Sequence, residues 1–327
     1  MVGRLLAVLV ALPFLAGGVT AAVSADRGEV VLTFADPAVV ESSGLVALDD
    51  LVVTVNDSGD SGRVFAVGPE GRTVGVTTFA ESPTDVEALA PVATDSADEV
   101  WVGDIGDNAA ARSSISVTRV PVTRGDRSGE YPTFELVYAD GPRDAETLLV
   151  DPTTGRLHVV SKEIFGGTLY AAPQRLSADR PNVLEPVADA LAVATDGAFW
   201  PDGRHLVVRG YGRAVVYEWP SMTAVADLDL PDQDQGEGIA VTADGRVLVS
   251  TEGQFTDVLE VPLPREVRQA VAPERPTSGA DRGRPASAPA PVVEEPRALP
   301  LPLWLLLGGG AGVVVLLGLV AWAVRRR

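Results

Sequence analysis

The sequence has no cysteine, only two histidines and a single lysine among its 327 residues. Without cysteine, neither disulfide bonds nor thiol chemistry can contribute to stability or to catalysis. The two histidines, His158 and His205, stand outside any HExxH or GxSxG motif, which argues against a histidine-built zinc site and against a Ser-His-Asp triad. The chain must therefore be stabilised by its packed core, and any site must be built mainly from carboxylates.

Basic residues are scarce as a class. Residues 26–263 contain 40 Asp and Glu against 16 Arg and Lys, a net charge of −24, whereas the whole chain carries −19. Nucleic acid is excluded as a partner because its phosphates would be repelled where basic contacts are needed. Cations, basic peptides and neutral ligands remain as partners. For most of these carboxylates, keeping an exported protein soluble is a sufficient role.

What the sequence does have is a repeat. The stretch Asp144–Glu163 (DAETLLVDPTTGRLHVVSKE) reads as an acidic loop, a strand, a turn, a second strand and a second acidic loop. Related stretches occur at 43–60, 85–108, 196–212 and 236–253, and the equivalent positions are Gly44, Ala88, Thr147, Gly197 and Gly238. Their spacings of 44, 59, 50 and 41 residues are typical of the blades of a β-propeller.

Further strand-like runs follow each of these pairs, so that a repeat supplies four strands. They lie at 63–67 and 73–79, 114–122 and 133–138, 168–172 and 183–187, 214–219 and 224–230, and the fifth repeat has only 258–261. Residues 29–34 (EVVLTF) are expected to supply the missing strand and to close the ring, which leaves no bare sheet edge. We therefore predict an all-β fold, a β-propeller of five four-stranded blades. The long second repeat leaves a six-bladed alternative open.

Both ends of the chain differ from the repeats. Residues 1–25, with a basic residue before an apolar run, are typical of a cleaved signal peptide, and an uncleaved anchor is the alternative. Residues 264–300 are rich in proline, alanine and serine and are expected to form an extended, disordered linker after the propeller domain at 26–263. Residues 301–324 carry no charge and precede three arginines at 325–327, so we predict one transmembrane helix and a short cytoplasmic tail. This arrangement places the propeller outside the cell and holds it at the membrane.

In a propeller blade, the loop before the first strand and the loop after the second strand lie on the same face, near the central channel. The loops before the first strands supply Glu41, Asp85, Glu87, Asp144, Glu146, Asp196 and Glu237. The loops after the second strands supply Asp57, Asp60, Asp104, Asp107, Asn108, Lys162, Glu163, Arg209 and Glu252. Carboxylates gathered in this way bind a hard cation or have raised pKa values. The alternative is that the Asp and Asn residues are only turn formers.

Six of these residues are candidate ligand contacts at the channel mouth: Asp57, Asp104, Asp107, Asn108, Lys162 and Arg209. Lys162 is the only lysine, and we expect it either to serve as an internal counter-ion for the acids or to contact an anionic group of a ligand. Arg209 holds the equivalent position in the next blade, so the same two roles apply to it.

Four segments carry a resemblance to a known family. They are SGL (43–45), DVEAL (85–89), DAETLLVDPTTGRLHVVSKE (144–163) and GEGIAVTADGRVLVSTEG (236–253). Together they resemble the phytase-like β-propeller family, also described as esterase-like activity of phytase, and related exported propellers of the gluconolactonase type. The resemblance implies that five glutamates face the channel, with calcium as the bound cofactor: Glu87, Glu146, Glu163, Glu237 and Glu252.

The similarity covers most of residues 40–263, and GDIGDN (103–108) is its most distinctive segment. The fourth blade departs from the pattern, because Asp196-Gly197 precedes its first strand and Arg209 stands where an acid is expected. This departure weakens the case for an inherited catalytic activity.

Two functions are compatible with these features. The first is a cell-surface binding or scaffolding module whose acidic face engages a cation, a ligand or a protein, and the absence of a recognisable nucleophile favours it. The second, implied by the resemblance, is a calcium-dependent hydrolase of phosphate esters or lactones. We favour the binding module and leave open whether the chain is an enzyme.

Overall fold

The computed structural model describes residues 28–80, 82–93 and 98–272. Within them the chain forms strands β1 to β21 and one short helix, α2. The expectation of an all-β fold is therefore confirmed. The expected signal peptide (1–25), membrane span (301–324) and basic tail (325–327) lie outside the described residues. Among the residues that are described, no helix has the length and apolar character needed to cross a membrane.

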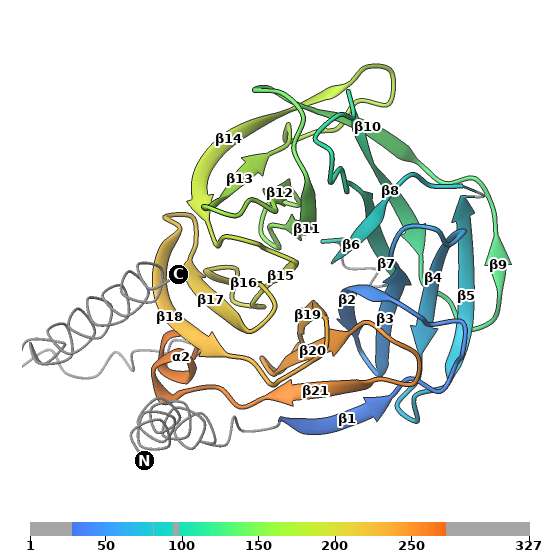
Figure 1. Ribbon diagram of the computed structural model, residues 1–327, viewed down its shortest axis with the longest axis vertical. Coiled ribbons are helices and arrows are strands. Elements are labelled where there is room, and N and C mark those ends of the chain that lie inside the picture. The colour runs from blue at the N-terminus through green and yellow to red at the C-terminus, as the bar shows by residue number, and fades with distance from the viewer. Residues whose placement is uncertain (1–27, 81, 94–97, 273–327) are drawn as a thin grey trace, which may run out of the picture. The chain divides into compact units, whose positions relative to one another are not determined.

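The strands form five antiparallel units of four around a common axis (Figure 1). Unit 1 contains β2 (Ser42–Leu48), β3 (Leu51–Asn56), β4 (Gly62–Val67) and β5 (Thr73–Ala80). Unit 2 contains β6 (Val86–Pro91), β7 (Glu99–Asp104), β8 (Ile115–Pro121) and β10 (Thr133–Tyr138). Unit 3 contains β11 (Ala145–Val150), β12 (Leu157–Ser161), β13 (Gly167–Ala171) and β14 (Asn182–Ala190). Unit 4 contains β15 (Asp196–Phe199), β16 (His205–Arg209), β17 (Arg213–Glu218) and β18 (Thr223–Asp229). Unit 5 contains β19 (Gly236–Val241), β20 (Val247–Thr251), β21 (Asp257–Val261) and β1 (Glu29–Thr33).

The ring of units is closed at its centre and at its rim. The inner strands β2, β6, β11, β15 and β19 each contact the next one around the axis, and β19 contacts β2. At the rim, β1 pairs antiparallel with β21, so that Glu29 lies opposite Glu260. The expectation that residues 29–34 supply the fourth strand of the last repeat is confirmed. Strands from the two ends of the repeat region thus complete one unit.

The extra length of the second repeat does not add a unit. It contains β9 (Arg127–Ser128), a two-residue strand that pairs in parallel with β5 of unit 1. The outer strands β10 and β14 also pair in parallel, and they join units 2 and 3 into one eight-stranded sheet. The described residues contain no sixth four-stranded unit, so the six-unit alternative is excluded for them.

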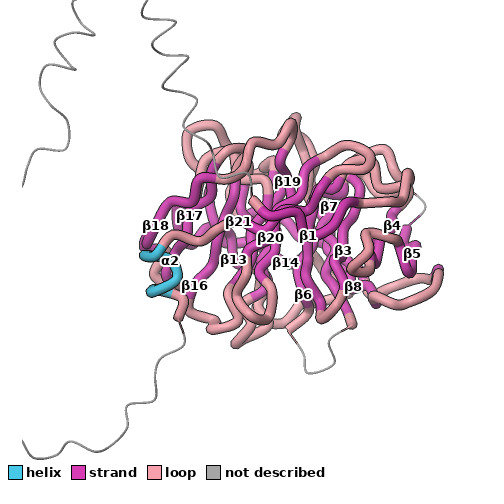
Figure 2. The backbone as a smooth tube through the Cα atoms, turned by 90° about the horizontal axis from the view of Figure 1, so that it is seen from below, coloured by secondary structure: helices cyan, strands magenta, loops and turns pink. Residues whose placement is uncertain are grey.

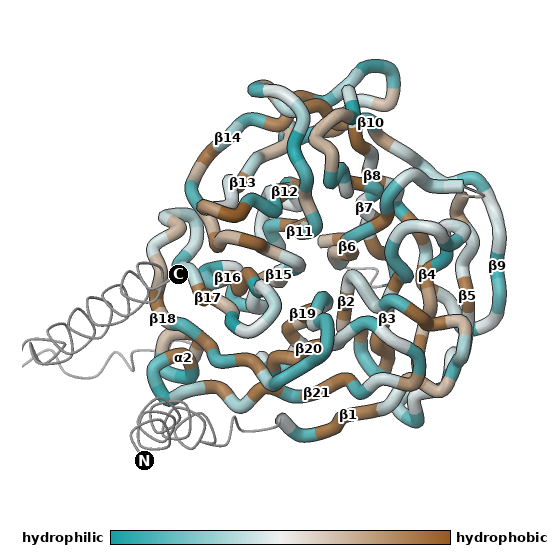
Figure 3. The backbone as a smooth tube through the Cα atoms, viewed as in Figure 1, coloured by the Kyte–Doolittle hydropathy of each residue, from teal (hydrophilic) through white to brown (hydrophobic). Residues whose placement is uncertain are grey.

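The hydrophobic core lies between neighbouring units. The buried apolar side chains form five clusters, one at each boundary between two units. Because side chains alternate between the faces of a strand, Val53 and Val55 of β3 pack towards unit 2, while Val52 packs towards unit 5. With both faces buried, the inner strands are apolar beyond their first residues, and Figure 3 shows brown, hydrophobic stretches on strands around the ring.

The first residues of the expected linker are folded. Helix α2 (Arg265–Ala270) follows β21 and buries Val267 in the cluster between units 4 and 5. Leu263, which precedes the helix, and Val271, which ends it, pack against the same cluster. The expectation of an extended chain from residue 264 is therefore wrong for this segment. Its few apolar residues are enough to pack against the core, although the surrounding residues are mostly polar. The rest of the expected linker, from 273, lies outside the described residues.

The strands run between two faces that carry the loops (Figure 2). One face carries the loops before the inner strands and the loops after the second strands of the units, and we call it the acidic face. The opposite face carries the turns between the first and second strands. Equivalent loops of the five repeats therefore lie at the same end of the central channel.

Candidate functional site

Each inner strand begins with the same kind of triplet at the acidic face. The triplets are Ser43-Gly44-Leu45, Glu87-Ala88-Leu89, Glu146-Thr147-Leu148, Asp196-Gly197-Ala198 and Glu237-Gly238-Ile239. In four of the five units, the pairing with the second strand shifts register here; in unit 3, for example, Ala145 pairs with Ser161 and Thr147 with Val160. A bulged residue leaves the ladder, and its side chain is re-aimed. The bulges therefore release the first residue of four of the five triplets from the regular alternation; Asp196 of unit 4 pairs regularly with Arg209.

The second residue of the triplet is small because the inner strands approach one another closely. A Cβ atom on Gly44 would lie 2.5 Å from the backbone nitrogen of Leu89 in the next unit. On Gly238 it would lie 2.8 Å from Cβ of Leu45. These approaches draw the inner strands together and bring the first residues of the five triplets to one narrow mouth.

Three glutamates of this ring are buried. Glu87, Glu146 and Glu237 are 4%, 5% and 3% exposed. Burial raises the pKa of Glu87 to about 10, and repulsion from Glu146, Asp57 and Asp85 adds to the rise. Burial also raises the pKa values of Glu146 and Glu237. The mouth is therefore an environment that penalises full ionisation of its own side chains.

Two carboxylate oxygens at the mouth lack a protein partner. Oε2 of Glu146 and Oε2 of Glu237 are buried and have no hydrogen bond within the described part of the chain. The other oxygen of Glu146 accepts a hydrogen bond from Nζ of Lys162. A buried carboxylate oxygen without a donor is costly, so these two atoms favour a positively charged or hydrogen-bonding group at the mouth.

Lys162 lies where the sequence analysis placed it, among the acids. Its ammonium group pairs with Glu146 and sits 5.3 Å from the ring centre of Tyr211. Burial alone would lower the pKa of Lys162, but the neighbouring Glu146 raises it above the usual value. The counter-ion role expected for this residue agrees with the contact, and Lys162 remains charged at neutral pH.

A second group of carboxylates joins units 1 and 2. One oxygen each from Asp57, Asp85 and Glu87 lies within 4.8 Å of the others. Ser43 donates a hydrogen bond to Oε2 of Glu87 at 3.0 Å, which orients that carboxyl group. Burial raises the pKa of Asp85, and the charge of Asp57 adds to the effect. We call Asp57, Asp85 and Glu87 the carboxylate trio.

The GDIGDN segment builds the wall of the trio. A Cβ atom on Gly106 would lie 2.5 Å from Oδ2 of Asp85, so only glycine lets that carboxylate lie there. Asp104 accepts the backbone N–H groups of Thr84 and Asp85 at 2.9 and 3.0 Å. It also pairs with Arg112 at 2.8 Å. Asp104 thus orders the loop that holds the trio.

Asp107 and Asn108 lie further along the same loop. Asp107 accepts the backbone N–H groups of Ala111 and Arg112 at 2.9 and 2.7 Å. Its own N–H donates to Oδ1 of Asp144 at 2.9 Å. Asn108 is exposed. The structure gives Asp107 a role in loop conformation, whereas ligand contact by Asn108 stays a prediction.

The remaining two glutamates of the expected metal set differ from each other. Glu252 joins the ring: burial raises its pKa to about 7, and repulsion from Glu237, Asp57 and Glu41 contributes. Glu163 instead pairs with Arg143 at 3.2 Å. The structure therefore groups Glu87, Glu146, Glu237 and Glu252 and gives Glu163 an ion pair of its own.

Arg209 is fully buried and clamps units 4 and 5 together. Its Nη1 donates to the carbonyl oxygens of Gly238 at 3.0 Å and Ser250 at 3.3 Å. Burial lowers its pKa to about 10, and Glu237 and Asp196 oppose the shift. A Cβ atom on Gly236 would lie 2.2 Å from Nη2, so the clamp depends on that glycine. Arg209 is enclosed by protein, and the ligand contact expected for it is not available in this conformation.

Asp196, the other departure of the fourth repeat, is fully buried as well. It accepts backbone N–H groups of Gly197 at 2.7 Å, Ile239 at 2.8 Å and Leu45 at 3.3 Å. The last two amides belong to the bulged inner strands of units 5 and 1. Burial raises the pKa of Asp196, and the three amides oppose the rise. The side chain holds three inner strands in register at the mouth.

The sequence reasoning placed Asp85 in the acidic ring but did not select it as a metal ligand. Its signal was its place two residues before Glu87, in the loop that enters β6 (Val86–Pro91). Tyr211 and Ser43 were also missed as members of the site. A tyrosine in a short loop and a serine before a strand are too common to stand out.

The comparisons with known proteins leave the family open. No protein-family model matches the chain, and no curated protein matches it either. The resemblance to phytase-like propellers therefore stays a prediction.

Proposed function

We propose that the chain is a five-bladed β-propeller displayed outside the cell, which binds a divalent cation at the acidic mouth of its central channel. The carboxylate trio is the observation that carries the proposal, because three ligand oxygens from Asp57, Asp85 and Glu87 already lie within 4.8 Å of one another. The ring of five four-stranded units supports the propeller. The predicted signal peptide and membrane span support the location at the cell surface.

Calcium is the cation that we propose for the trio. It accepts six to eight oxygen ligands in flexible geometry, whereas magnesium requires a tight octahedron and gives up water reluctantly. Three carboxylates leave room for water or a ligand to complete the coordination shell. Because burial and the neighbouring carboxylates raise the pKa of Glu87 to about 10, the cation would displace a proton from this group, so binding should strengthen as the pH rises.

In this proposal the cation prepares the acidic face for a partner. The bound ion would fix the loops that carry Asp57 and Asp85, and Lys162 with Tyr211 would stand on another side of the same mouth. A partner that brings an anionic group could contact the ion and the ammonium group together, whereas a basic group could pair with Glu237 and Glu252. We therefore favour a binding or scaffolding module.

A second candidate, a calcium-dependent hydrolase of phosphate esters or lactones, is favoured by the position of Lys162. A cation at the trio would polarise a phosphoryl or carbonyl oxygen, and a nearby ammonium group would stabilise developing negative charge. A screen of phosphate esters and lactones with calcium and with chelator tests it. Chelator-sensitive turnover that is lost in Lys162→Met supports the hydrolase, and no turnover across both classes supports the binding module.

The cation site itself is tested by calorimetric titration with calcium, magnesium and sodium chloride at matched ionic strength. Glu87→Gln removes one ligand while keeping the shape of the side chain, and Glu185→Gln, on the exposed surface of β14, is the matched control. We expect calcium-specific binding in the parent and the control and at least a tenfold loss in Glu87→Gln. A response to all three salts that Glu87→Gln leaves unchanged would indicate only screening of a highly acidic domain.

A further inference from the structure

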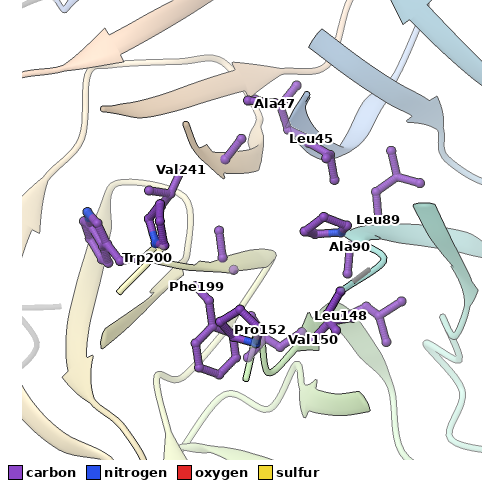
Figure 4. A pocket seen from close by; sticks show the side chains of 18 of the residues that line it. Leu45, Ala47, Leu89, Ala90, Leu148, Val150, Pro152, Phe199, Trp200 and Val241 are labelled. Atoms are coloured by element: carbon purple, nitrogen blue, oxygen red, sulfur yellow. The ribbon is translucent and has the colours of Figure 1, made fainter. Parts of the chain in front are cut away.

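The opposite mouth of the central channel is a pocket of a different kind (Figure 4). Its volume is about 520 Å³, and all five units contribute to it. Each unit supplies the end of its inner strand and the turn that follows, such as Ala47 of β2, Ala198 of β15 and Val241 of β19. The volume lies within the range of small-molecule pockets.

The side chains that line this pocket are apolar. Among the residues that the structure describes, no lining residue has a charged side chain, and the only polar side-chain atom of the lining belongs to Trp200. That atom, Nε1, already donates to the carbonyl oxygen of Gly245 at 3.3 Å. Leu45, Val150 and Phe199 are representative of the rest of the lining. A chain with a net charge of −19 thus has, within its described part, a concave surface whose lining side chains carry no charge.

The pocket is lined by other residues than the acidic mouth. No carboxylate of the acidic mouth is among the described residues that line it. In each triplet the first residue lies at the acidic mouth, while the third residue or its successor lines the pocket, as Leu45, Leu89 and Leu148 do. A ligand in the pocket would therefore contact none of the carboxylates that we propose to bind the cation.

We propose that this pocket binds a small uncharged apolar molecule, of the aliphatic or aromatic class. The lining side chains offer water no hydrogen bond, and burial of an apolar ligand against them is favourable in proportion to the apolar area removed from water. A charged ligand would lose its hydration without finding a partner. A polypeptide segment would bring backbone N–H and C=O groups into a space where no side chain can pair with them. The chemistry of the walls therefore selects a small neutral molecule.

The experiment is photolabelling of the full chain with a medium-chain alkyl diazirine, followed by mass spectrometry to map the labelled residues. A carboxylate-terminated diazirine of the same length is the second probe. Ala47→Phe and Ala198→Phe each place a ring in the pocket, whereas Ala224→Phe makes the same change on the exposed face of β18. An unlabelled alkane in excess is the competitor.

We expect saturable labelling of the inner-strand ends by the neutral probe, suppressed by the competitor. We expect at least a tenfold reduction in Ala47→Phe and Ala198→Phe, no change in Ala224→Phe, and at least tenfold weaker labelling by the carboxylate probe. Labelling that avoids the inner-strand ends, that the pocket-filling variants leave unchanged, or that is equal for both probes would overturn the proposal. The comparison of the two probes needs no variant, so it decides the matter even where a filled variant fails to fold.

Discussion

Replacement of Glu87 by glutamine should change how the stability of the protein depends on pH. In the folded chain, burial and the neighbouring carboxylates raise the pKa of Glu87 from 4.5 to about 10. Between these two pH values the folded state holds a proton that the unfolded state has released. The stabilisation is therefore fully present below pH 4.5 and is lost as the pH rises towards 10. Glutamine does not titrate, so the variant should lose this dependence.

The expected size follows from the same shift. One pKa unit corresponds to about 1.4 kcal/mol, so the parent should lose up to about 1.4 kcal/mol of unfolding free energy per pH unit through this one group. At pH 7, which lies two and a half units above the unfolded pKa, the upper bound is about 3 kcal/mol. The introduced glutamine is neutral, like the protonated Glu87 of the folded parent, and it can still accept the hydrogen bond from Ser43. Glu87→Gln should therefore be more stable than the parent at pH 7, by about 1–3 kcal/mol in chelator.

Urea unfolding between pH 4.5 and 9, in chelator and in calcium, measures the effect. In chelator the parent and Glu87→Gln should be equally stable at pH 4.5 and diverge as the pH rises, while Glu185→Gln should follow the parent. In calcium the order should reverse at pH 7, because only the parent keeps all three ligands of the trio. Parallel stability curves for parent and Glu87→Gln in chelator would refute the reasoning.

Three further substitutions test the contacts that hold the units together. In each case the free energy of unfolding is measured by chemical denaturation for the variant and for a matched control. Gly236→Ala should destabilise the chain by about 1–3 kcal/mol, because the new Cβ meets the Arg209 guanidinium, whereas Gly212→Ala, with nothing within 4 Å, should have little effect. Arg209→Met should cost about 1–3 kcal/mol, because it leaves the carbonyl oxygens of Gly238 and Ser250 without their donor, whereas Arg213→Met removes only an exposed ion pair and should stay within about 0.5 kcal/mol of the parent. Val267→Ala should cost about 2 kcal/mol if α2 is part of the folded domain, whereas Val225→Ala on the exposed surface of β18 should not. Equal stability of a variant and its control would contradict the contact in question.

The strands could be predicted from the sequence because their signal is local. The run at 133–138 has the expected bounds, and the other expected runs differ from the strands by a few residues at their ends. The closing strand at 29–34 was also predictable, since the last repeat lacked a strand and an open sheet edge is unfavourable. Helix α2 was missed because three apolar residues at spacing four are a weak signal beside proline and charged residues.

The site could be predicted only in part, because its details depend on contacts between units. The repeat indicated which acids gather at one mouth, and Glu87, Glu146, Glu237 and Glu252 do so. It did not reveal that Arg209 would point away from the mouth into the carbonyl oxygens of unit 5. It also did not reveal the shifts in strand pairing, because a bulge requires no particular residue type and so leaves no mark in the sequence pattern. Long-range partners decided these features, and a repeat read along the chain carries no information about them.

The triplet at the start of each inner strand explains why the two ends of the channel differ. Its first residue is acidic or a serine. In four units this residue lies at a bulge, and in unit 4 it is Asp196, which binds the backbone of the bulged strands, so the polar group stays at the acidic mouth. Its second residue is small because neighbouring backbones nearly touch, which narrows the channel between the two ends. From the third residue onward the strand is apolar, and five copies of that pattern produce the apolar pocket. A polar substitution such as Val241→Asp should therefore abolish neutral probe labelling of the pocket and leave calcium binding at the trio unchanged, since Val241 lines the pocket and the three carboxylates do not. Loss of both activities together in a folded variant would mean that the channel is one continuous site.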